Sequence, residues 1–460
     1  MSPLMRFANS ILCLAAAMHC WAEDNTSQKQ AEISPENPVL SLTVVNDNPE
    51  VSRHLNLGFQ CCLLNYQEKA LYHFRQSLAA DNTCLMAHVG MLMVYPSGSP
   101  EYKAELKAVN QLIDSSVCTP AEEWYLSTFL QYIAGDLQGA AKAFKQRAEV
   151  YRRDVMAACW DILLNHYAAE QGGNIVQRAD HLIERHPDNP IACYCRALLD
   201  EYTPAPGEKA LQAAQKAVSL LTGTPSAHLL YGHLLRRSGR LDEAISQYQA
   251  AQKSSMDDLA HIAISDAATY RIASLAEVSS YWQAGKKIEA LRRSLALTQQ
   301  IKSGAGEGDI LMHWEARTLP LRLLVLQPSP PAGAAINAAA KACNAASGDP
   351  VRLVQDCLVA AIQARSLAES GRHSIAVQTL HKAETSLTEL RSLADEMNRA
   401  GGLKRTCYKR SLQACMGAVL KARLTLYQDT EDIWKPHFDE LLTIPETRLM
   451  PPVLPQFNQK

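Results

Sequence analysis

Small residues recur along this chain at a fixed distance. Ala70 and Ala104 are 34 residues apart, and so are Ala210 and Ala244. A period of this length is typical of stacked helical hairpins, because each hairpin must bury one face against its neighbour. Further alanines of the series are Ala140, Ala290 and Ala376. The spacing therefore predicts a repetitive helical surface of the kind that holds another molecule.

Composition supports helices and argues against a charge-driven function. The 460 residues are 47% hydrophobic but only 6% aromatic, a balance that suits the close packing of Ala- and Leu-rich helices and is poor for a β-sandwich. The net charge is −2, so no overall field attracts nucleic acid or an acidic membrane. We expect an all-α protein.

The first 22 residues have the pattern of a signal peptide. Arg6 precedes an apolar stretch from Ile11 to Met18, and Cys20-Trp21-Ala22 before Glu23 is a small-x-small cleavage site. A lipid anchor on Cys20 is the alternative. No later segment is apolar for long enough to span a bilayer, so we expect an exported protein without an integral membrane segment. By analogy with other exported helical-repeat proteins, it would be a bacterial periplasmic or secreted protein.

The repeats resemble the tetratricopeptide repeat. The match is clearest in three places, where a glycine, small residues and an aromatic residue keep the expected order: 51–84 with Gly58, Ala70 and Phe74, 121–154 with Gly135, and 225–258 with Gly239. The glycine after the first helix ends that helix in a left-handed conformation. The resemblance implies a right-handed α-α superhelix of helical hairpins.

The same patterns predict the organisation of the chain. A flexible leader occupies 23–50 because it is polar and rich in Pro and Asn. About seven repeats follow at 51–304, then an irregular helical insert at 305–356, a degenerate hairpin with capping helices at 357–444, and an extended tail at 445–460. A generic α-bundle whose alanine spacings coincide is the alternative to the repeat array.

No motif predicts catalysis, a metal or a cofactor. The chain lacks a phosphate-binding glycine loop, a nucleophile elbow and paired-Cys zinc spacing. His228 and His233 share a predicted helix, but a gap of five residues turns the second side chain about 140° from the first, which spoils chelation. An unrecognised enzymatic site in the insert is the remaining alternative, and its candidate acids and bases are Glu307, Asp309, His313 and Glu315.

One cysteine pair has the spacing of a disulfide. Cys343 and Cys357 each lie seven residues from Pro350, on opposite arms of a predicted hairpin that turns at 348–350. Arms of equal length bring the two side chains level, and a bridge there would close a short loop. The alternative is that both are small buried hydrophobic residues.

The resemblance also implies a binding surface, because in this type of repeat the first helix of each hairpin lines a concave face. Aromatic side chains exposed in a concavity are favoured anchors for a partner, and paired arginines suit a carboxylate. The spacing of Tyr125, Phe129 and Tyr132 equally fits a buried helix face, and the double arginine could be a solvated face. The predicted groove residues are Phe59, Tyr125, Phe129, Tyr132, Tyr167, Tyr202, His233, Arg236, Arg237 and Trp282.

The functional expectation is a non-enzymatic scaffold or adaptor of the cell envelope that binds a protein or an extended peptide. The alternative is an envelope protein that binds carbohydrate or another small ligand on the same repeats. A cleft around Trp282 and Trp314 would distinguish the small-ligand-binding protein from the protein-binding scaffold.

Overall fold

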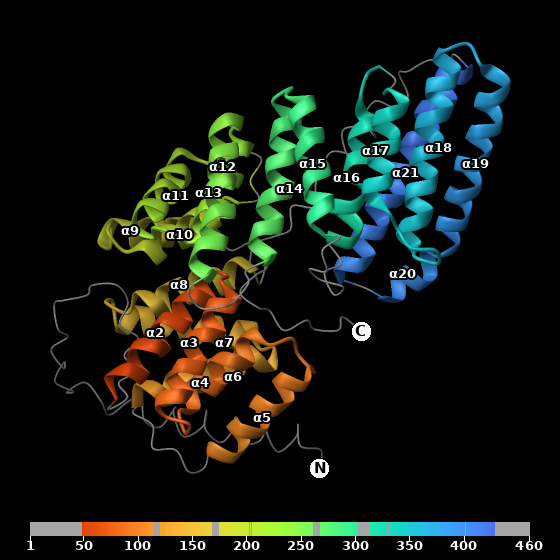
Figure 1. Cartoon of the computed structure of the whole chain (residues 1–460). Helices are drawn as coiled ribbons and strands as arrows, with labels where there is room; N and C mark the ends of the chain where they lie inside the picture. Colours follow the sequence, from red (N-terminus) through yellow and green to blue (C-terminus); the bar gives the residue numbers. More distant parts are fainter. Residues whose placement is uncertain are drawn as a thin grey trace. The chain divides into compact units, whose positions relative to one another are not determined.

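The computed structural model describes residues 48–113, 120–167, 174–201, 203, 205–260, 267–301, 312–329, 331–400 and 402–427. All regular secondary structure in these residues is helical (Figure 1). The chain divides into two compact units. The first unit contains residues up to 240 and 250–270, and the second contains 241–249 and the helices from residue 271 onward.

The first unit is a run of helical hairpins in which each helix packs on the next, except that α5 and α6 both pack on α4. The prediction of an all-α chain of sequential helical hairpins is confirmed. Its helices are α2 (Pro49–Leu63), α3 (Gln67–Ala80), α4 (Leu85–Val94), α5 (Pro100–Leu112), α6 (Pro120–Ala134), α7 (Leu137–Val150), α8 (Val155–Tyr167), α9 (Ile175–Arg185), α10 (Pro190–Leu198), α11 (Glu208–Leu220) and α12 (Pro225–Arg237).

Local sequence signals set the ends of these helices. Asn48 and Asn189 precede a proline at the helix start, and their side chains accept hydrogen bonds from backbone N–H groups of the first turn. The turn after α6 carries Gly135 with φ 93°, and the turn after α12 carries Gly239 with φ 76°. The left-handed turn glycines are therefore confirmed at these repeats, and Asn65 with φ 54° takes the same role after α2.

A single aromatic ring joins the first two hairpins. Phe74 on α3 is fully buried, and a Cβ added at Gly58 on α2 or at Gly90 on α4 would overlap its ring. Both glycines therefore let neighbouring backbones approach the ring closely. The sequence pattern identified Gly58 but not Gly90. Ala104, by contrast, is exposed on α5, so its spacing from Ala70 does not reflect an equivalent packing position.

The first helices of the hairpins converge within the first unit. α2 packs on α4, α4 on α6 and α8 on α10, and α10 also contacts α2. Phe59 stacks on Phe129 of α6 with ring centroids 4.8 Å apart, and the Tyr194 hydroxyl donates a hydrogen bond to the Leu64 carbonyl at 3.4 Å. The curvature is thus tight enough for helices several hairpins apart to touch, and side chains fill the space between them.

The second unit continues with hairpins and ends in a three-helix packing. Its central helix, α18, packs on α16, α19 and α21, and its core is rich in leucine and alanine. The helices that belong to it, from residue 241 onward, are α13 (Leu241–Ala260), α14 (Ala267–Gln283), α15 (Lys287–Ile301), the π-helical turn η1 (Met312–Ala316), α16 (Arg317–Leu326), α17 (Gly333–Cys343), α18 (Pro350–Glu369), α19 (His373–Ser392), α20 (Ala394–Ala400) and α21 (Gly402–Tyr427). The first two of these also contribute residues to the first unit.

The predicted insert is more regular than expected. Within 305–356 the described residues form η1, α16 and α17 and the start of α18, and only the short π-helical turn departs from hairpin geometry. Pro350 begins α18, with Asp349 accepting a hydrogen bond from the Val351 N–H at 2.9 Å. The turn predicted at 348–350 is therefore present.

The signal peptide, the predicted leader up to residue 47 and the tail lie outside the described residues. The last residues of the predicted leader are helical rather than flexible, because Asn48 caps α2 and α2 begins at Pro49. Among the helices that the structure describes, none combines the length and the apolar character needed to cross a membrane.

We expect Gly58→Ala and Gly90→Ala each to lower the free energy of unfolding by about 1–3 kcal/mol, because the added methyl must displace the Phe74 ring. Chemical denaturation of the full chain measures the change. Gly333→Ala is the matched control, since a Cβ there meets no atom within 4 Å. A loss of stability no larger than that of the control would contradict the packing argument.

Candidate functional site

The aromatic residues predicted to line a groove form the core of the first unit instead. Phe59, Tyr125 and Phe129 are 0% exposed and Tyr132 is 1% exposed. Phe129 contacts Phe59, Tyr125, Phe144 and Trp160 through ring pairs with centroid distances of 4.8–5.8 Å. The prediction that these four residues line an open groove is therefore wrong. The hairpins curve so tightly that rings on the inner helices contact each other. Tyr202 and the side chain of Tyr167 lie outside the described residues.

Tyr125 belongs to a buried polar network. Its hydroxyl donates to the Asp154 carboxylate at 2.8 Å, and Arg147 Nε donates to the same carboxylate at 2.6 Å. Asp154 also accepts the Ala157 N–H at 3.0 Å at the start of α8. Burial and the neighbouring Asp154 raise the pKa of Tyr125 well above its ordinary value, so the hydroxyl stays protonated. The network joins α6, α7 and α8, and its role is structural.

The end of α12 carries three basic residues, of which one is buried and two are half-buried. His233 Nδ1 lies 3.0 Å from Glu201 Oε1, and both side chains are buried. Arg236 and Arg237 are half-buried in the last turn of the helix. Arg237 Nη1 donates to the Thr203 carbonyl at 3.0 Å. We call His233, Arg236 and Arg237 the basic cluster.

The loop before α11 is held in place beside this cluster. Asp200 Oδ2 accepts the Gly207 N–H at 3.1 Å, and the Thr203 N–H donates to the Asp200 carbonyl at 3.1 Å. The Thr203 carbonyl is therefore fixed where Arg237 reaches it. The sequence alone gave no signal that Glu201 would pair with His233, because the pair is 32 residues apart and Glu201 follows the end of its helix.

In the second unit, Trp282 is 7% exposed and packs into the core rather than lining a groove. Lys287 Nζ lies 5.6 Å from the centre of its ring. Trp314 is 3% exposed in the same core, so neither tryptophan provides an open wall for a cleft. The prediction that Trp282 lines the groove is therefore wrong as well.

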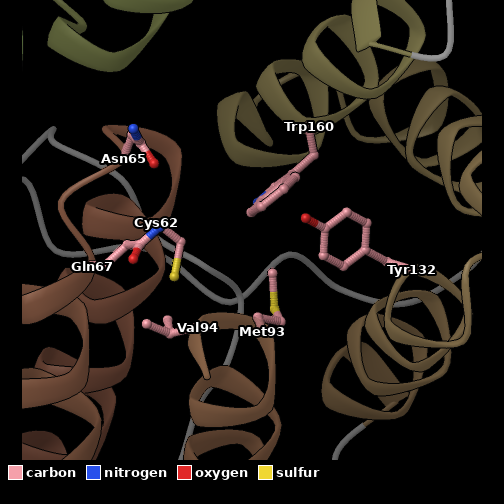
Figure 2. A pocket seen from close by; sticks show the side chains of 7 residues that line it. All are labelled: Cys62, Asn65, Gln67, Met93, Val94, Tyr132 and Trp160. Atoms are coloured by element: carbon pink, nitrogen blue, oxygen red, sulfur yellow. The ribbon is translucent and has the colours of Figure 1, made fainter. Parts of the chain in front are cut away.

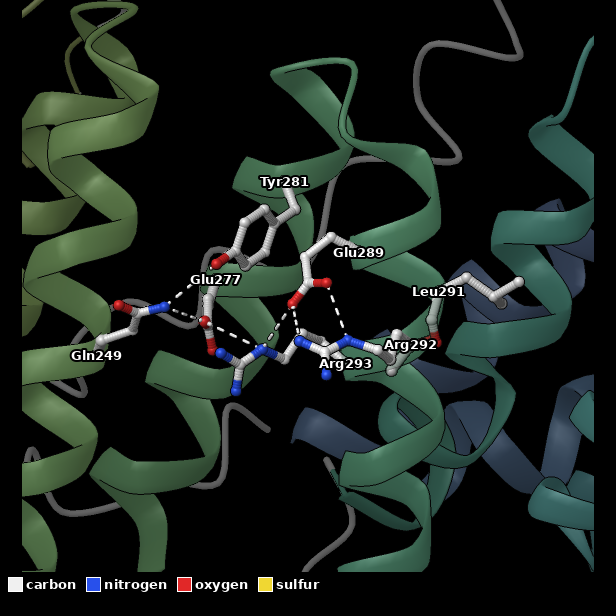
Figure 3. Close-up of polar contacts among 8 residues, drawn as sticks. Gln249, Glu277, Tyr281, Glu289, Leu291, Arg292 and Arg293 are labelled. Carbon is white, nitrogen blue, oxygen red and sulfur yellow. Dashed lines mark hydrogen bonds and ion pairs between the residues drawn. The ribbon is translucent and has the colours of Figure 1, made fainter.

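A polar network ties α13, α14 and α15 together in this unit (Figure 3). The buried Glu277 accepts from Gln249 Nε2 at 2.9 Å and lies 3.7 Å from Arg293 Nε. Glu289 pairs with Arg292 at 2.6 Å and with Arg293 at 3.2 Å (Figure 3). The acidic and basic groups satisfy one another, which indicates a structural link between helices.

The candidate acids and bases of the insert do not form a site in the described residues. Glu315 is 3% exposed and pairs with the buried Arg322 on the next helical turns. Glu307 and Asp309 and the side chain of His313 lie outside the described residues. No group of three or more metal-binding side chains occurs in the part of the chain that the structure describes.

The predicted disulfide is not formed. Cys343 and Cys357 are both free and buried. α21 instead brings Cys415 within hydrogen-bonding reach of Cys357, and burial together with this contact raises the pKa of the Cys415 thiol well above its ordinary value. Equal arm length was not sufficient, because it does not determine which way each side chain points around its helix.

Comparisons with known proteins add little to this geometry. No family model matches the chain, and no curated protein matches it. The chain is similar to a solved structure described as the APC/C hetero-tetramer Cut9-Hcn1, with 11% identity over 94% of this chain and 80% of that one and a TM-score of 0.33. It is also similar to the P58(IPK) TPR domain, with 15% identity over 83% of this chain and 99% of that one and a TM-score of 0.20. The tetratricopeptide-like description therefore follows from the hairpin order and turn positions of the chain itself.

Burial makes His233 a pH-dependent stability element. Burial first, and then the nearby Arg236 and Arg237, lower its pKa below 6.5, although Glu201 acts in the opposite direction. Below pH 6.5 the unfolded chain therefore binds a proton that the folded chain resists, and stability falls as the pH drops through the lowered pKa. We expect the free energy of unfolding of the wild-type chain to decrease more steeply from pH 7 to 5 than that of His233→Gln, by up to about 1.4 kcal/mol per pH unit. Denaturation series at several pH values measure both slopes.

His381→Gln is the control for this pH series, because the His381 side chain is 81% exposed. It should keep the wild-type slope. Equal slopes for the wild-type chain and His233→Gln would contradict the burial argument.

Proposed function

We propose that this protein is a non-catalytic scaffold that binds an extended, acidic segment of a partner protein. The observation that carries the proposal is the contrast between two stretches of the inner helices. At α2, α6 and α8 these positions are filled by core aromatic rings, whereas the end of α12 keeps two half-buried guanidinium groups.

The chemistry of the basic cluster favours a carboxylate. Arginine presents a planar fork of donors that matches a carboxylate, and charge-assisted hydrogen bonds of this kind are stronger than neutral ones. The loop carbonyl of Thr203 restrains Arg237, so part of the entropy cost of ordering that side chain is met before a partner binds. His233 lies on the same helix, where it is buried and paired with Glu201.

An adaptor role in the cell envelope is part of the same proposal. It rests on the signal-peptide pattern of residues 1–22 and on the repeat architecture. The partner is thus expected among exported proteins.

Charge reversal at the basic cluster tests the binding role. A library of seven-residue peptides is selected on the full chain, and enriched peptides are expected to be acidic. Arg236→Glu/Arg237→Glu should weaken their binding by tenfold or more, because each lost charge-assisted hydrogen bond costs about 1.5–3 kcal/mol. Isothermal titration or fluorescence anisotropy of a labelled peptide gives the dissociation constants.

Arg152→Glu/Arg153→Glu is the matched control, since these two adjacent arginines are exposed and the substitution changes the net charge equally. It should bind within about twofold of wild type once salt is raised to screen long-range effects. Selection of peptides without acidic residues, or equal losses in both double variants, would refute the assignment of this surface.

Export is tested by the mature N-terminus. When the full chain is expressed in a bacterium, the purified protein should begin at Glu23, because signal peptidase cleaves after Ala22. Intact mass spectrometry measures the start, and Leu14→Arg, which interrupts the apolar stretch, should abolish processing. Protein that retains Met1 in the wild-type chain would contradict export, and a diacylglyceryl modification of Cys20 would favour the anchored alternative.

A further inference from the structure

Two buried cysteines of the second unit lie next to each other in the core around α18. Cys357 on α18 and Cys415 on α21 are free thiols in the structure, and both are 0% exposed. The two helices pack on each other, and Cys415 Sγ lies 3.9 Å from the carbonyl oxygen of Val354, one turn before Cys357. The two thiols are within hydrogen-bonding reach of each other.

Small residues accompany this pair on both helices. Ala361 follows Cys357 by one turn on α18, Ala418 follows Cys415 by one turn on α21, and both alanines are buried in the same core. The separation of packed helices depends on the side chains at their contact, and alanine permits a short one. A disulfide joins its sulfur atoms at about 2.05 Å, which thiols already in contact reach through small side-chain rotations.

Burial alone does not distinguish this pair, because a buried cysteine commonly serves as a small hydrophobic residue. Figure 2 shows such a case in the first unit. Cys62 lines a small cavity together with apolar, amide and aromatic side chains, and none of the other described residues that line it is a cysteine. The direct contact between two thiols is what sets Cys357 and Cys415 apart.

We propose that Cys357 and Cys415 form a disulfide as the exported chain folds. This pairing rests on the export part of the proposed function, because disulfides persist in oxidising compartments whereas cytosolic thiols are kept reduced. The bond closes a loop that contains α19 and α20, and it therefore restricts the unfolded chain. It also ties α21 covalently to α18, the central helix of the second unit.

The oxidant is an organic disulfide, such as oxidised glutathione or the disulfide of an exported oxidoreductase. One cysteine thiolate attacks a sulfur of this disulfide, which breaks its S–S bond, releases one thiolate and leaves a mixed disulfide. The second cysteine thiolate attacks the protein sulfur of the mixed disulfide, forms the new S–S bond and releases the second thiolate. Two electrons pass from the cysteine pair to the oxidant, and the two thiol protons end on the released thiols.

The bond forms before the core closes. In the folded chain both thiols are fully buried, so an oxidant does not reach them. Burial also raises the pKa of the Cys415 thiol well above its ordinary value, which keeps the reactive thiolate scarce. The pair is therefore a structural bridge made during folding and not a switch that opens and closes in the folded protein.

Refolding of the full chain tests the pairing. The reduced chain is refolded from urea with oxidised and reduced glutathione, free thiols are alkylated in denaturant, and tryptic peptides are identified by mass spectrometry without reduction. Trypsin places the three relevant cysteines in separate peptides, which are 342–352 with Cys343, 353–365 with Cys357 and 411–421 with Cys415. The Cys357 and Cys415 peptides should be joined and the Cys343 peptide alkylated. The same glutathione mixture added to the folded, reduced chain should leave all three alkylated.

The midpoint of urea unfolding with and without reductant gives a second readout. Reductant should lower the midpoint of the wild-type chain more than that of Cys357→Ala/Cys415→Ala, because the double variant has no bridge to lose. Each variant is compared with itself, so the effect of the space left by alanine cancels. Cys343→Ala is the matched control, since it removes a buried cysteine of the same core and should keep the wild-type response.

Three results would overturn the pairing. They are alkylation of both the Cys357 and the Cys415 peptide after refolding with oxidised glutathione, a bond from Cys357 to Cys343 instead, and an equal response to reductant in the wild-type chain and the double variant. Protein purified from a bacterium separates this pairing from export. A chain that begins at Glu23 with both thiols free overturns the disulfide and leaves export in place, whereas a chain that retains Met1 overturns export, and the refolded sample then decides the pairing.

Discussion

The structure depends on aromatic rings that fill the space between the inner helices of the first unit. Phe74 lies between Gly58 and Gly90, and Phe59 stacks on Phe129 two hairpins away. Such contacts require small residues on the approaching backbones and large ones between them, and they set how sharply consecutive hairpins turn. Because the turn is tight, α10 reaches α2, and the face that would otherwise be an open groove becomes core. The basic cluster accordingly lies at the end of an inner helix, α12.

Several buried carboxylates of this protein are paired with a buried or half-buried basic group. Asp154 is paired with Arg147 and Tyr125, Glu315 with Arg322, and Glu277 lies close to Arg293 and Gln249. A charged group at such sites would be costly without its partner, so the networks add specificity to the way in which each helix meets the next.

Much of the fold could be predicted because repeat signals are local. Gly135 and Gly239 mark turns that require a left-handed residue, and Ala70 and Ala140 mark helix crossings, as the structure confirms. The spacing of alanines alone was misleading in the hairpin of α4 and α5. Ala104 continues the 34-residue spacing but is exposed, whereas Gly90 is the small residue that packs against Phe74. The candidate site was harder to predict. Tyr125, Phe129 and Tyr132 have a spacing common to a groove and to a core, and only the position of the neighbouring helices distinguishes the two.

The sequence by itself determined that the chain is helical, that the helices form hairpins, and where most of the turns fall. These properties depend on periodicity, on caps and on glycine, which act within a few residues. Only the tertiary structure decided the curvature, the burial of the aromatic residues, the pairing of His233 with Glu201 and the meeting of Cys357 with Cys415 instead of Cys343. Each of these is a contact between side chains far apart in sequence, and small changes in the angle between hairpins accumulate before such residues can meet.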